Sequence, residues 1–105
     1  MLDDINTVLE WIDRLSKKRQ RNKEQSDFDG VMLGLYHLGN KGRESVFLSQ
    51  LEKLSLPKMQ ILMATERGIA EGKVDDCGWR IGASLWGLTA KGRLYVEALL
   101  EEASS

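Results

Sequence analysis

Apolar residues recur at helical spacing at the start of the chain, with Trp11 at the edge of the stripe that they form. The stripe consists of Leu2, Ile5, Val8, Leu9, Ile12 and Leu15. This spacing predicts an amphipathic helix. Residues that favour helices continue past the stripe to Gln25, so we expect a solvated basic extension there, either helical or frayed.

A second helix is predicted by a start signal, a repeating apolar face and a stop. Ser26 and Asp27 are typical of a helix start. The apolar face that follows consists of Phe28, Val31, Met32, Leu35 and Leu38. Gly39, Asn40 and Gly42 are expected to end this helix in a turn.

Two short helices joined by a tight turn are predicted next, after a brief strand at Val46 and Phe47. Ser49 and Glu52 match the capping box S-x-x-E, which predicts a helix over about residues 50–54. Ser55 then caps a helix over residues 57–67, whose first turn suits Pro57 and which Gly68 stops. Helices joined by so short a turn cross steeply, as in a helix-turn-helix, and residues 57–67 take the recognition-helix position.

The segment over residues 72–88 carries strand and turn signals. Residues 75–78 are expected to form a bend, and Trp79 and Ile81 alternate with Arg80 as in a strand. A second turn signal follows at residues 82–84, so either glycine cluster is a candidate hairpin tip.

A last helix is predicted over residues 90–102, with Thr89 as its N-cap. This helix is apolar around much of its circumference, which predicts two apolar neighbours. One is the domain core, and the other is the N-terminal helix, supplied either by the same chain or by a second subunit.

Length and composition predict one soluble domain. The chain has 105 residues, of which 42% are hydrophobic and 30% charged. Its apolar runs are too short to span a membrane, and its N-terminus lacks the pattern of a secretory signal, so we expect a cytoplasmic protein. Cys77 is the only cysteine, which excludes an internal disulfide and a cysteine-based metal cluster.

The net charge of −1 conceals an uneven distribution. Residues 14–23 contain no acid, and their cations are Arg14, Lys17, Lys18, Arg19, Arg21 and Lys23. Such a basic run suits either a solvated helix face or contact with phosphates.

No enzyme motif is present in the sequence. A phosphate-binding glycine loop, a paired histidine and glutamate metal motif and a Ser-His-Asp set are all absent, and His37 is the only histidine. We therefore expect no catalysis, no metal site and no cofactor.

Residues 46–92 resemble bacterial winged-helix transcriptional regulators of the MarR or PadR kind. The phrases ERGIAEGKV at residues 66–74 and LTAKGRLYVEALL at residues 88–100 carry the resemblance. It implies a mainly α fold with a small β-hairpin wing (α+β), a winged helix-turn-helix with extra terminal helices. Residues 1–25 would form an amphipathic and then basic helix, and residues 26–105 the winged-helix domain with its C-terminal helix over residues 90–102.

The resemblance implies a small transcriptional regulator that reads double-stranded DNA with helix 57–67 and wing 72–88. The excess of apolar surface on the last helix separately predicts a homodimer through the terminal helices. In such families the second helix of the pair enters the major groove and the wing contacts the flanking DNA. The candidate DNA contacts are Lys58, Gln60, Arg67, Arg80, Lys41 and Arg43.

An alternative interpretation is a winged-helix module that binds protein, like a phage or plasmid adaptor or antirepressor. Helix 57–67 is poor in hydrogen-bonding side chains for a DNA reader. Met59 and Met63 would usually lie in a core, and an adaptable partner surface is the other interpretation. Trp79 and Trp86 suit covering the core more than stacking on a ligand.

Overall fold

The computed structural model describes residues 2–18 and 22–104, and the side chains of residues 5–17 and 22–104. The side chains of Leu2 and Lys18 and the basic residues Arg19 and Arg21 therefore lie outside the described part. The elements are α1 (Leu2–Lys18), α2 (Lys23–Leu38), β1 (Val46–Phe47), α3 (Leu48–Glu52), α4 (Lys58–Ala70), β2 (Val74–Arg80), β3 (Ala83–Leu88) and α5 (Ala90–Ser104). The molecule is mainly helical with a small antiparallel sheet, which agrees with the predicted α+β class.

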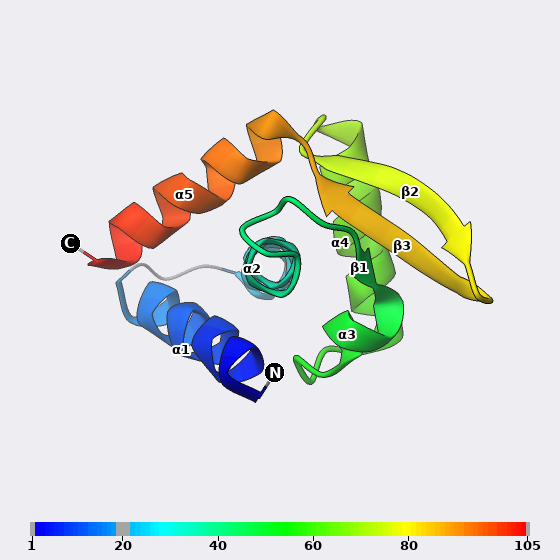
Figure 1. The fold of residues 1–105 in the computed structure, drawn as a ribbon. Coiled ribbons are helices and arrows are strands. Elements are labelled where there is room, and N and C mark those ends of the chain that lie inside the picture. The colour runs from blue at the N-terminus through cyan, green and yellow to red at the C-terminus, as the bar shows by residue number, and fades with distance from the viewer. Residues whose placement is uncertain (1, 19–21, 105) are drawn as a thin grey trace.

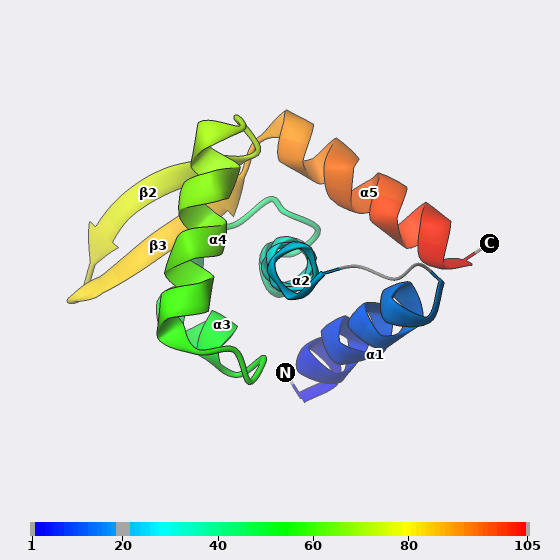
Figure 2. The same ribbon diagram turned by 180° about the vertical axis from the view of Figure 1, so that it is seen from behind.

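Helix α2 lies at the centre of the molecule, and the other elements surround it (Figure 1). Helices α1 and α5 lie on one side of it, and α3, α4 and the sheet lie on the other, as Figure 2 also shows from behind. All the residues of α2 from Asp27 to Tyr36 are buried. A helix that is buried on every side needs neighbours all around it, which explains this arrangement.

Helix α1 packs its apolar stripe against α2 and α5. Val8 and Leu15 are buried, and Ile5 and Ile12 pack against the core from its edge. The predicted amphipathic helix is confirmed. Since α5 also contacts α2 and β3, it has the two kinds of apolar neighbour that its composition predicted, both within one chain.

Helix α2 begins earlier than predicted. The Asn22 side chain accepts a hydrogen bond from the Gln25 backbone N–H at 2.7 Å, and Asn22 itself is extended. Asn22 is therefore the N-cap, and the prediction that Ser26 and Asp27 start this helix is wrong. Residues 23–25 belong to α2 and do not continue α1.

Helix α3 begins at Leu48, so the expected helix over residues 50–54 is shifted by two residues. The predicted capping box at Ser49 is wrong, because Gln50 makes the cap contact instead: its Oε1 accepts the Phe47 backbone N–H at 2.8 Å. Ser55 has a φ of 64° in the turn that follows, and Pro57 is the N-cap of α4, so the prediction that Ser55 caps this helix is wrong.

Helix α4 continues through Gly68 to Ala70, so the prediction that Gly68 stops it is wrong. Gly68 is buried, and a Cβ atom there would collide with Cγ2 of Val74 and contact the ring of Phe28 at 3.8 Å. The glycine allows α4 to approach β2 closely, and it does not act as a helix terminator.

The sheet has the strand order β1-β3-β2, and all pairs are antiparallel. Strands β2 and β3 form the hairpin, residues 74–88. Arg80 pairs with Ala83, and the turn between them consists of Ile81 and Gly82. Both turn residues have positive φ, at 51° and 72°, as in the two-residue turns that match strand twist. The second glycine cluster is therefore the hairpin tip.

Residues 75–78, which contain the first of the two turn signals, do not bend the chain away from the sheet. The bend predicted there is therefore wrong. Those residues lie within β2, where the register shifts between Asp76 and Gly78 and leaves Cys77 as a bulge. The Asp76 carboxylate accepts the Gly78 N–H at 2.9 Å and so holds the bulge. A bulge accommodates these turn-forming residues locally without ending the strand.

Thr89 caps α5 as predicted, because its Oγ1 accepts the Gly92 N–H at 3.0 Å. The same hydroxyl donates to the carbonyl of Gly72 at 2.7 Å, which ties α5 to the end of α4. Within the described ranges, the structure contains no helix with both the length and the apolar character needed to cross a membrane.

Candidate interaction surface on helix α4 and the hairpin

Helix α4 has a buried side and an exposed side. Ile61, Ala64, Thr65 and Gly68 are buried against α2 and the sheet. At about 100° per residue, the opposite side of the helix carries Met59, Met63, Glu66 and Ala70, and all four are exposed. The helix therefore presents an outward face, which we define as these four residues.

The two methionines are the main surprise of this face. The side chains of Met59 and Met63 are 64% and 49% exposed, so the prediction that they lie in the core is wrong. The inward positions are taken by Ile61, Ala64 and Thr65, which leaves the methionines on the far side of the helix. An exposed, adaptable methionine pair is typical of protein-binding surfaces.

The half-buried Arg67 side chain is held by contacts with α2 and with the C-terminal end of its own helix. Its Nε donates to Oε2 of Glu71 at 2.9 Å, and its Nη2 donates to Oε1 of Gln25 at 2.9 Å. Its guanidinium also lies 4.0 Å from the centre of the Phe28 ring. Hydrogen bonds from Lys73 and Arg67 hold the pKa of Glu71 below its usual value. Arg67 thus joins α4 to α2, which engages the donors that DNA contact would require.

A second part of this network reaches α5 through Tyr95. Its hydroxyl donates to Oδ1 of Asp29 at 2.6 Å and accepts from Nε2 of Gln25 at 3.1 Å. Burial raises the pKa of Tyr95, and the hydrogen bond to Asp29 raises it further. Gln25 therefore connects Arg67 of α4 with Tyr95 of α5, and the network fixes three helices relative to one another.

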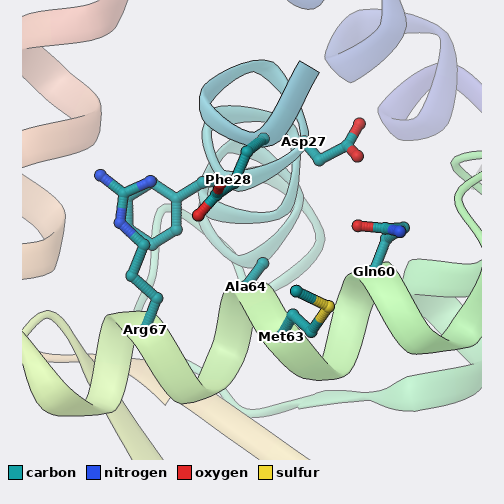
Figure 3. A pocket seen from close by; sticks show the side chains of 7 residues that line it. Asp27, Phe28, Gln60, Met63, Ala64 and Arg67 are labelled. Atoms are coloured by element: carbon teal, nitrogen blue, oxygen red, sulfur yellow. The ribbon is translucent and has the colours of Figure 1, made fainter. Parts of the chain in front are cut away.

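Gln60 lies at a small pocket between α2 and α4, shown in Figure 3. The pocket has a volume of about 50 Å³ and is lined by Glu24, Asp27, Phe28, Gln60, Met63, Ala64 and Arg67. The Asp27 carboxylate is paired with Lys23 at 3.1 Å. Across the described residues, no group of three or more histidine, cysteine, aspartate or glutamate side chains is arranged to hold a metal ion.

The end of the hairpin carries two exposed apolar side chains. Trp79 is 69% exposed and Ile81 is 97% exposed, whereas Trp86 is buried. Packing of the core was therefore the correct interpretation for Trp86 and the wrong one for Trp79. Trp79 is too close to the tip of the hairpin to be covered, and alternation alone did not reveal where the sheet leaves the core.

Strand register places Trp79 on the core-facing side of the sheet. Trp79 pairs with Ser84, and Ser84, Trp86 and Leu88 alternate on one side of β3. Trp86 and Leu88 on this side pack into the core between the sheet and the helices. Trp79 lies on this same side of the sheet, but beyond the end of the core.

The remaining predicted DNA contacts lie in separate places. Lys58 is exposed at the first residue of α4. Arg80 is exposed near Phe47, Cys77 and Leu85, around a hollow on the side of the sheet opposite Trp79. The structure does not bring Arg80 onto the side of the hairpin that continues from the core.

Lys41 and Arg43 lie in the turn between α2 and β1 and are exposed. Gly42 between them packs against Arg93 of α5 and Leu88. This turn passes in front of the molecule in Figure 1, with α4 behind it. Lys41 and Arg43 are therefore near α5 and do not join Lys58 on α4.

Acidic groups outnumber available cations around the outward face of α4. Lys23 and Arg67 are paired with Asp27 and Glu71. The other acids on or beside the face, the pocket and the hairpin are Glu24, Glu66, Asp75 and Asp76, and the other cations there are Lys58 and Arg80. This balance disfavours contact with phosphates.

Comparisons of the chain with protein-family models, with curated proteins and with solved structures found no match.

Proposed function

We propose that residues 26–104 form a winged helix-turn-helix, with α3 and α4 as the helix pair and the hairpin as the wing, and that α4 and the wing bind another protein. The order of elements from α2 to α5 supports the fold assignment, as does the short turn between α3 and α4. In this proposal the protein is a cytoplasmic adaptor that acts through contact and carries out no catalysis.

The exposure of Met59 and Met63 is the observation that carries this proposal. A helix that reads DNA presents hydrogen-bonding side chains to base edges. The outward face of α4 instead presents two thioether side chains and the carboxylate of Glu66, which would repel phosphates. Flexible methionine side chains suit a protein surface because they adapt to its shape.

A pull-down from lysate of the source cells tests the proposal. We expect the wild-type chain to retain a protein that Met59→Glu and Met63→Glu fail to retain, because a carboxylate cannot be buried unpaired in an apolar contact. Ala98→Glu is the control, since Ala98 is an exposed apolar residue on α5, outside both α4 and the hairpin. Equal retention by all four chains would contradict the proposal.

DNA binding is the second candidate function, and the exposed Lys58 at the first turn of α4 favours it. A cation there could meet a phosphate together with the backbone N–H groups of the helix start. Fluorescence anisotropy with duplex DNA at two salt concentrations tests it. A salt-dependent affinity that Lys58→Ala weakens would support a transcriptional regulator, and absence of binding at low salt would reject it.

A homodimer through the terminal helices is part of the DNA-binding proposal. Most of the apolar stripe of α1 is used within the chain, and Leu94 and Leu9 are apolar side chains that the terminal helices leave exposed. Light scattering after size exclusion measures the mass of wild type and Leu94→Glu. A dimeric wild type and a monomeric variant would support the interface, and a monomeric wild type would reject it.

A further inference from the structure

Ile81 stands where the conformation of the backbone disfavours its side chain. Its φ of 51° lies in the left-handed region, and its side chain is almost fully exposed at the hairpin tip. Asparagine and glycine adopt this conformation readily, whereas a β-branched residue there is a true outlier. An apolar side chain that is both strained and uncovered gains nothing for the fold, which is typical of a residue kept for contact with a partner.

Trp79 extends the apolar part of the hairpin end on its core-facing side. Met59 and Met63 form the apolar part of the outward face of α4. Figure 2 shows α4 and the hairpin side by side at the end of the molecule opposite α1, with the start of α5 beside the C-terminal end of α4. The four side chains thus belong to two neighbouring elements that project from the core on one side.

Beside these apolar side chains, acidic groups outnumber cations: Lys58 lies at the first residue of α4, and Arg80 is on the side of the sheet opposite Trp79. Glu66 lies on the outward face of α4, and Asp76 pairs with Trp86 on the same side of the sheet as Trp79. Glu24 lines the pocket beside Met63. Complementary potentials favour a partner with positive charge around an apolar centre.

We infer that the outward face of α4 and the hairpin tip bind a lysine- or arginine-rich amphipathic segment of another protein. Its apolar side chains would lie on Met59, Met63, Trp79 and Ile81, and its cations would lie near Glu66 and Asp76. This inference rests on the proposed protein-binding function and specifies the chemistry of the partner.

Selection from a random-peptide display library on the intact chain tests the inference. We expect enriched peptides to combine apolar residues at helical spacing with lysine or arginine. A synthetic, fluorescently labelled copy of an enriched peptide should bind the wild type, and Glu66→Lys should weaken its affinity about tenfold by reversing a charge at the contact. Asp13→Lys on α1 is the control and should leave the affinity unchanged.

Ile81→Asn separates contact from folding. Asparagine relieves the backbone strain, so the variant should keep or raise the thermal midpoint while it weakens peptide binding about tenfold. A simple structural role for Ile81 predicts the opposite result, a lower midpoint with unchanged affinity.

The outcomes distinguish this inference from the function on which it rests. Enriched peptides that lack cations, or an affinity unaffected by Glu66→Lys and Ile81→Asn, would overturn the inference alone, provided that Met63→Glu still abolishes binding. Enriched peptides that bind Met59→Glu and Met63→Glu as well as the wild type would overturn both. Enrichment of no peptide, together with salt-dependent binding of duplex DNA that Glu66→Lys strengthens, would also overturn both and assign the surface to nucleic acid.

Discussion

The two sides of helix α4 differ in how their side chains are engaged. On the inner side, Gly68 packs against Val74, and Arg67 is fixed by Glu71 and Gln25. On the outer side, the long and flexible side chains of Met59 and Met63 face solvent. The inner side thus holds the fold together through close packing and the contacts of Arg67, whereas the outer side leaves two apolar side chains and the carboxylate of Glu66 open to partners.

This contrast shows that residue type alone does not give a role on a short helix. An arginine at the end of a recognition helix suggests phosphate contact, yet here the guanidinium of Arg67 binds Gln25 of α2 and so connects α2 with α4. Methionine suggests a core, yet the core positions belong to smaller or branched residues. The position of each residue around the helix axis decides between these roles.

Gly68→Ala should have the largest effect on stability. The added methyl group collides with Val74, so we expect a loss of about 2–3 kcal/mol in the free energy of unfolding, measured by urea denaturation. Gly30→Ala is the control, because the nearest atom to the Cβ there would be the terminal methyl of Ile12, at 3.2 Å, with no collision like that at Gly68. Equal stability of both variants would mean that the inner side is packed loosely.

Arg67→Met should have the next largest effect. It keeps an unbranched side chain over Phe28 but leaves Oε2 of Glu71 and Oε1 of Gln25 without their donor, so we expect a loss of about 2 kcal/mol in urea denaturation. Lys58→Met, at an exposed position, should change the value by less than about 0.5 kcal/mol. If the two variants had equal effects, Arg67 would belong functionally with the exposed cations.

Acid should weaken the contacts that Glu71 makes with Arg67 and Lys73 on the inner side. The pKa of Glu71 is lowered in the folded state, so its contribution to stability is fully present above its usual value of about 4.5 and is lost as pH falls through the lowered pKa. Because Glu71 is about one-third exposed, the contribution is about 0.5 kcal/mol. Glu71→Gln should show a correspondingly flatter dependence of unfolding free energy on pH in this range.

Met63→Gln should have the smallest effect on stability. A polar side chain of similar length at an exposed site should change the free energy of unfolding by less than about 0.5 kcal/mol. A loss above about 2 kcal/mol would place Met63 in the core and abolish the contrast between the two sides of α4.

Local signals predicted the order of the elements and several of their ends. Thr89 caps α5 because a threonine before a helical repeat has a local partner in the Gly92 N–H. Turn signals left two glycine clusters as candidates for the hairpin tip, and the structure places the tip at Ile81 and Gly82, which have positive φ. Such features depend on residues within a few positions of one another, so the sequence alone contains them.

The features that were missed depend on distant neighbours. Gly68 appeared to stop α4, but its role is set by Val74 and Phe28 across the core. Helix α4 carries apolar residues on all sides: Met59, Ile61, Leu62, Met63 and Ala64. The sequence pattern therefore does not indicate which side of the helix is buried. The packing of α2 and β2 against α4 determines which side is buried, and the methionines are exposed because they lie on the other side.

The bulge in β2 also has a practical consequence. It places the thiol of Cys77 near Gly87 and beside the hollow on the far side of the sheet from Trp79. Because Cys77 is exposed and is the only cysteine of the chain, one fluorophore or spin label can be attached there without further engineering. A label on Cys77 would therefore lie on the hairpin but outside the proposed contact, where it can report movement of the hairpin when a partner binds.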